Sequence, residues 1–182
     1  MKNVVLFVLL LTIGNPLLCQ LTIPTIKHGS NDKSFTEDPL IKSLVDQSEI
    51  VILFRGHSSW TWNAPFRGIY FTKNKLWHYC KVTFNYKEKT IANIDVPEDS
   101  IRKIWKSIVA NDILGLSDER QIVDTCSAMI FDSIEFEFRI ITPTEYKRIN
   151  YIDPEFFEKN CPGNVSRQKK IKCVKEIYAR KQ

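Results

Sequence analysis

Residues 97–115, PEDSIRKIWKSIVANDILG, are the stretch that decides the fold. Pro97 suits the first position of a helix, where its missing N–H leaves no bond unmade, and the two acidic residues after it favour the positive end of the helix dipole. Gly115 suits the position just past a helix end. The apolar residues recur at helical spacing; they are Ile101, Ile104, Trp105, Ile108 and Ile113. We therefore predict a long central helix that buries this stripe against a β-sheet.

The segments on both sides of this helix have the pattern of strands. Residues 49–54, EIVILF, are rich in β-branched residues, and short runs at 68–72, 76–86 and 90–96 also have the pattern of strands. Residues 133–140, SIEFEFRI, alternate strictly, which predicts one buried and one solvated face in an antiparallel sheet. The two faces carry Ile134, Phe136, Phe138 and Ile140 on the dry side and Glu135, Glu137 and Arg139 on the wet side. In the hairpin with residues 146–152, we expect Lys147 or Arg148 to pair with Glu135 or Glu137.

The order of elements predicts a single α+β domain at residues 37–182, with one antiparallel sheet packed by the long central helix and a C-terminal helix. The C-terminal helix should begin near Ser166 and bury Ile171, Val174, Ile177 and Tyr178, with its lysines outside. Residues 167–181 hold seven basic residues and one acidic residue. Such a face is either solvated or suited to an anionic membrane or an acidic partner. Export and the absence of a recognised motif argue against nucleic acid as a partner.

The N-terminus has the pattern of a secretory signal at residues 1–19: a basic residue, the apolar run VVLFVLLLTI and a helix breaker. Cleavage after Cys19 would leave a flexible arm at residues 20–36. The alternative is a lipoprotein anchored at Cys19, the one route by which we expect a membrane attachment. We otherwise expect a periplasmic or secreted protein.

Four cysteines remain after residue 19, and an even number in an oxidising compartment favours disulfides. They are Cys80, Cys126, Cys161 and Cys173. We prefer the pairs Cys161–Cys173 and Cys80–Cys126, with buried free thiols as the alternative. Zinc is disfavoured because no two of them have C-x-x-C spacing.

No stretch carries a catalytic, metal-binding or cofactor-binding motif, so we assign no catalytic residue, metal or cofactor. The candidate binding surface is residues 55–68, RGHSSWTWNAPFRG, which we interpret as a loop. Its candidate residues are Arg55, His57, Trp60 and Trp62, because two tryptophans in a polar segment form a platform for a glycan or a peptide. The alternative is a loop that folds back over a sheet end. His57 beside Ser58 and Ser59 is a weak nucleophile–base pattern.

The order of elements, with YIDPEFFEKNCPG at residues 151–163 before a basic terminal helix, resembles small uncharacterised exported proteins of Gram-negative bacteria. The resemblance covers residues 50–180, and because those proteins have no assigned activity it implies no functional residue. Three functions stay open. The first is an exported, non-enzymatic binding or envelope-associated module that meets a glycan, peptide or protein. The second is a secreted hydrolase with its site on the 55–68 loop, and the third is an inhibitor of a secreted enzyme.

Overall fold

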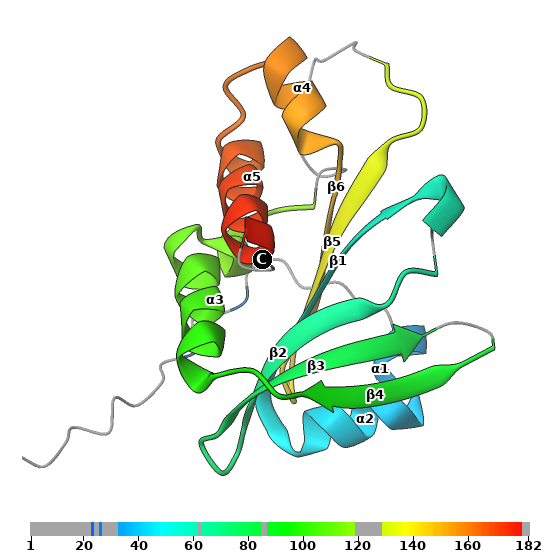
Figure 1. Ribbon diagram of the computed structural model, residues 1–182, viewed down its shortest axis with the longest axis vertical. Coiled ribbons are helices and arrows are strands. Elements are labelled where there is room, and N and C mark those ends of the chain that lie inside the picture. Colours follow the sequence, from blue (N-terminus) through cyan, green and yellow to red (C-terminus); the bar gives the residue numbers. More distant parts are fainter. Residues whose placement is uncertain are drawn as a thin grey trace, which may run out of the picture.

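The predicted sheet is present in the computed structural model as six antiparallel strands in the order β4-β3-β2-β1-β5-β6 (Figure 1). The strands are β1 (Ser48–Ser58), β2 (Phe66–Thr72), β3 (Trp77–Phe84), β4 (Lys89–Ile94), β5 (Ile134–Ile141) and β6 (Tyr146–Ile152). The structure describes residues 23, 26, 33–61, 63–84, 87–118 and 129–179. The predicted signal segment at residues 1–19 lies outside them.

Helices cover both faces of the sheet (Figure 1). They are α1 (Lys33–Thr36), α2 (Pro39–Asp46), α3 (Glu98–Ala110), α4 (Pro154–Asn160) and α5 (Val165–Tyr178), with short 3-10 turns η1 (Ser59–Thr61) and η2 (Ile113–Gly115). Helices α1 and α2 close a smaller core on one face, and α3 with α5 close a larger core on the other. The prediction of an α+β domain with one antiparallel sheet, a central helix and a C-terminal helix is confirmed.

The central helix forms from the stretch that predicted it, and its apolar stripe is buried. It is shorter than expected, because it ends at Ala110 and Asp112 then adopts a left-handed conformation (φ 52°). Ile113 therefore reaches the core from η2 rather than from the helix, and Gly115 ends η2 rather than capping the helix. Pro97 is the cap residue just before the helix.

Two predicted faces differ in part from the structure. On β5, Glu137 is completely buried and Arg139 nearly so, whereas Ile134 is 45% exposed, because α1 covers the side expected to be wet. On α5, Ile177 is buried and Val174 and Tyr178 pack against the core as expected, but the buried side also includes Arg167, Lys170 and Cys173, which the expected stripe left outside. Lys170 Nζ donates to the carbonyl oxygens of two strand residues, so this lysine belongs to the core.

The folded part also begins earlier than residue 37. Ile26 and Phe35 are both buried, and Lys33–Thr36 form α1, within the segment expected to be a flexible arm. The sequence did not reveal this earlier start, because a four-residue helix that buries one aromatic ring is too short to show a helical repeat of apolar residues. No helix among the described residues is both long enough and apolar enough to cross a bilayer.

Candidate functional site

Half of the segment interpreted as a binding loop is strand. β1 runs on to Ser58, so Arg55 and His57 lie in the sheet, and β2 starts at Phe66. Arg55 stands opposite Glu137, and His57 stands opposite Glu135 on β5. Arg55 and His57 are therefore tolerated in a central strand, because an acidic residue faces each of them across the ladder.

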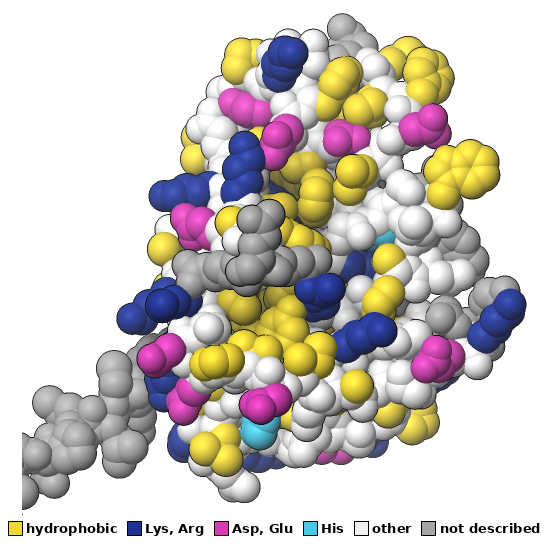
Figure 2. Space-filling view, in the orientation of Figure 1, with side chains coloured by type: hydrophobic (Ala, Val, Ile, Leu, Met, Phe, Trp, Pro, Cys, Tyr) yellow, Lys and Arg dark blue, Asp and Glu magenta, His cyan; other side chains and the backbone are white. Residues whose placement is uncertain are grey.

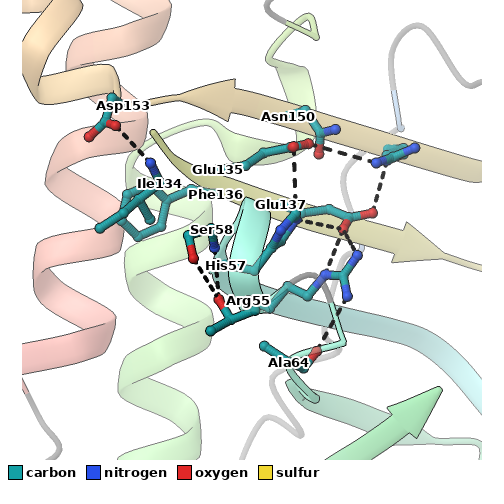
Figure 3. Close-up of polar contacts among 12 residues, drawn as sticks. Arg55, His57, Ser58, Ala64, Ile134, Glu135, Phe136, Glu137, Asn150 and Asp153 are labelled. Atoms are coloured by element: carbon teal, nitrogen blue, oxygen red, sulfur yellow. Dashed lines mark hydrogen bonds and ion pairs between the residues drawn. The ribbon is translucent and has the colours of Figure 1, made fainter. Parts of the chain in front are cut away.

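Glu137 is the centre of a buried ion-pair cluster between β1, β5 and β6 (Figure 3). One carboxylate oxygen accepts from Arg55 Nε at 2.8 Å and lies 2.7 Å from Arg55 Nη2. The other accepts from Arg139 Nε at 2.7 Å and lies 2.9 Å from Arg148 Nε. The Glu137 side chain has no exposed surface, which explains why it needs several cationic partners. We call Glu137, Arg55, Arg139 and Arg148 the Glu137 cluster.

The electrostatics of this cluster suit a structural role. Burial raises the pKa of Glu137, but the charges of Arg139, Arg55 and Arg148 outweigh that effect and hold the pKa below its usual value. A carboxylate held ionised by three guanidinium groups is a poor proton carrier near neutral pH. The arginines are also held by rings, since Arg139 lies 3.8 Å above the ring of Phe35 and Arg55 lies 4.2 Å above that of Phe66.

His57 lies beside the cluster without joining it by a hydrogen bond. Its Nε2 is 3.9 Å from carboxylate oxygens of Glu135 and Glu137, and its side chain is 10% exposed (Figure 3). Neither ring nitrogen has a hydrogen-bond partner within the described part of the chain. Ser58 points to the opposite face, because neighbouring residues of a strand alternate, and its hydroxyl lies 3.1 Å from that of Thr61. The nucleophile–base pairing of His57 with Ser58 is therefore wrong.

Of the two tryptophans expected to form a platform, the structure describes Trp60. Trp60 lies in η1 with 84% of its surface exposed, and Trp62 lies outside the described residues. The structure thus separates the three described candidate residues: Arg55 and His57 lie within the sheet on the face of the smaller core, and Trp60 lies in η1 beyond the end of β1.

The end of the sheet that carries Trp60 also carries exposed hydrophobic side chains from other segments, whose exposure the sequence did not reveal. Ser58 pairs with Ile134, and Glu135 pairs with Ile152, so the end of β1, the start of β5 and the end of β6 meet there. We define the apolar tip as the exposed Trp60, Met129, Phe131, Ile134 and Ile152 at this end of the sheet, where Ile134 and Ile152 project from opposite faces because Ile152 pairs with Glu135. Hydrophobic side chains are exposed at this end of the molecule, at the top of Figure 2. Strand pairing, which the sequence does not show, brings the end of β1, the start of β5 and the end of β6 to the same end of the sheet.

Both preferred disulfide pairs are wrong. Cys80 and Cys173 are buried free thiols, and burial raises the pKa of each to about 12. Cys80 lies in the smaller core and Cys173 in the larger one, on opposite faces of the sheet. Cys126, the expected partner of Cys80, lies outside the described residues.

Among the residues that the structure describes, no three histidine, cysteine or acidic side chains gather as a metal site would require. Comparison of the chain with models of known protein families, with curated proteins and with solved structures gave no match.

Proposed function

We propose that this protein is an exported, non-enzymatic binding module that meets a protein partner through the apolar tip. The observation that carries the proposal is the concentration of exposed hydrophobic side chains at one end of the sheet. Of the nine large hydrophobic residues exposed in the described chain, five belong to the tip. Soluble proteins rarely leave such side chains together in water unless the patch has a partner.

The chemistry of the tip favours a protein over a glycan. Phe131 is 87% exposed and Met129 is 79% exposed, and flexible or aromatic side chains of this kind are enriched at protein interfaces. Asp132 and Asp153 lie next to them in the sequence and add negative charge. A matching partner has an apolar patch bordered by lysine or arginine, and a secreted enzyme inhibited by this protein is one such case.

A hydrolase at residues 55–68 is the less supported alternative. Such a site needs a nucleophile within hydrogen-bond reach of His57. Ser58 points away from His57, and the nearby Glu137 is held ionised by arginines. A binding role needs no such group and uses Trp60, the one described member of the expected platform that is exposed.

The proposal of export rests on the signal pattern at residues 1–19. A processed protein in the periplasm or medium is expected to begin at Gln20, whereas the alternative lipoprotein keeps Cys19 with an attached lipid. Mass spectrometry of the protein from cell fractions separates these two forms, and an intact chain in the cytosol would contradict both.

Export also bears on the cysteines. Since Cys80 and Cys173 are buried thiols, Cys126 and Cys161 are the two that remain after residue 19. We propose that they form a disulfide, with two electrons and two protons passing to the oxidase of the compartment. A peptide map without reductant should contain a peptide that joins residues 126 and 161 and is lighter by two hydrogens than its reduced parts.

A photo-crosslinking amino acid at residue 131 tests the proposed binding surface. The matched control places the same group at Leu76, which is 56% exposed and lies in the β2–β3 turn, away from the tip. In the native cell envelope, we expect a discrete cross-linked protein from position 131 and not from position 76, lost when Trp60 is replaced by serine. Equal labelling from both positions, or labelling that survives Trp60→Ser unchanged, would contradict the proposal.

A further inference from the structure

A groove of about 750 Å³ lies between strands β2–β4 and helices α3 and α5. It opens on the face of the sheet opposite the Glu137 cluster and is separate from the apolar tip. Its volume is within the range of about 300–1,000 Å³ that is usual for small-molecule sites. The inference drawn from it is independent of the proposed function.

Apolar side chains form the floor of this groove. Ile104 comes from α3, Ile177 from α5, and Ile94 with Val96 from the edge strand β4 and the turn after it. Ile94 is 40% exposed, so the floor is open to a ligand from the side of the edge strand. In the area bordered by α3, α5 and β2–β4, Figure 2 shows hydrophobic surface with basic side chains at its border.

The polar border of the groove is basic. Arg67 and Lys81 are direct partners across the β2–β3 ladder, and Lys103 lies on the facing side of α3. No carboxylate is among the residues that line the groove, and neither lysine forms an ion pair within the described part of the chain. Three cations beside a small hollow, with no ion pair recorded for them in the described part of the chain, attract an anion.

Tyr79 adds a neutral hydroxyl next to these cations. Burial raises its pKa, although the charge and the hydrogen bond of Arg67 oppose that effect. The phenol therefore stays protonated near neutral pH and can donate to an anion. Arg67 offers a planar fork of N–H groups that suits a carboxylate or phosphate oxygen pair.

We propose that this groove binds a small single-chain amphiphile with an anionic headgroup. The headgroup lies between Arg67, Lys81 and Lys103, and the apolar chain lies along Ile94, Ile104 and Ile177. Both halves of the ligand are needed, because the cations supply orientation while the floor removes apolar surface from water. A nucleic acid fits less well, because its charged backbone has no apolar chain for this floor.

Calorimetric titration of the purified protein with dodecanoate tests the proposal. Dodecyl phosphate carries the alternative headgroup, dodecanol carries the same chain without charge, and acetate carries the headgroup without the chain. We expect saturable binding of dodecanoate or dodecyl phosphate, and at least tenfold weaker binding of dodecanol and of acetate. The ratio of the first two identifies the preferred headgroup.

Variants locate the site. The double variant Lys81→Met/Lys103→Met keeps the apolar stems and should raise the Kd for the anionic ligand at least tenfold. Lys106→Met is the matched control, because Lys106 is an exposed residue of the same helix and does not line the groove. Ile94→Asp places negative charge on the exposed part of the floor and should abolish binding with little change in Tm.

Three results would overturn the proposal. The first is that dodecanol binds as tightly as dodecanoate, which would show that the basic border has no role. The second is that Lys106→Met weakens binding as much as the double variant does, which would indicate a general attraction of the anion to a basic protein. Absence of saturable binding by both anionic ligands would remove the site altogether.

Discussion

The ion pairs around Glu137 make replacement by glutamine the most informative perturbation of this fold. The substitution keeps the shape of the side chain and removes its charge, which leaves three arginines without their shared partner. Removing one partner of a buried pair costs about 3–5 kcal/mol. The Arg148 side chain is 31% exposed and can be solvated, so we take the lower end, about 3 kcal/mol. For a domain of this size, that corresponds to a fall in Tm of about 6–12 °C.

The assay is urea unfolding at pH 7 with Glu135→Gln as the control. Glu135 lies two residues away on the same face of β5, but its side chain is 28% exposed and its ion pair with Arg148 is 3.8 Å long. We expect that control to lose at most about 1 kcal/mol. If Glu137→Gln destabilises the protein no more than Glu135→Gln does, the central role of Glu137 is refuted.

Acid should abolish the difference between the wild type and Glu137→Gln. The pKa of Glu137 in the folded protein lies below its ordinary value of 4.5. A lowered folded-state pKa means that the carboxylate stabilises the fold fully above that ordinary value, and that this contribution is lost as the pH falls through the folded-state pKa. A difference in unfolding free energy that stays constant from pH 7 into acid would contradict this reasoning.

Three further predictions concern buried sites on both sides of the sheet. Gly68→Ala should lose about 1–3 kcal/mol in urea unfolding, because an added Cβ would lie 2.6 Å from the backbone oxygen of Ile52 and 2.5 Å from Leu53 Cδ2. An unchanged midpoint would contradict the close approach. Burial lowers the pKa of Lys147 from 10.5 to about 8 in the folded protein. Between these two pH values the lysine is protonated in the unfolded chain but largely neutral in the folded one, so the wild type should gain stability relative to Lys147→Met as the pH rises from 8 toward 10.5. Parallel curves for the two proteins would contradict it. Cys80 and Cys173 should resist iodoacetamide at pH 8 in the native protein and react in urea, because burial raises the pKa of each thiol to about 12. Labelling of the native protein as fast as that of an exposed thiol would show that they are accessible.

The sequence determined the elements whose pattern is local. The helical stripe of Ile101, Ile104, Trp105 and Ile108 is buried as its spacing predicts. The alternation in residues 133–140 correctly assigned β5 and the opposite orientation of its neighbouring side chains. The predicted hairpin contact is confirmed for Arg148 with Glu137, whereas Lys147 points the other way and donates to the carbonyl of Leu114 at 2.8 Å.

Only the tertiary structure decided which faces are dry and which residues meet. Arg55 and Glu137 are 82 residues apart in the chain, so no local pattern shows that a charged segment is a central strand rather than a loop. The even number of cysteines predicts disulfide partners for Cys80 and Cys173, but the sheet places them in separate cores as free thiols. Periodicity states how side chains alternate within one element, whereas burial, charge pairing and the exposure of Trp60 depend on what distant segments lie against it.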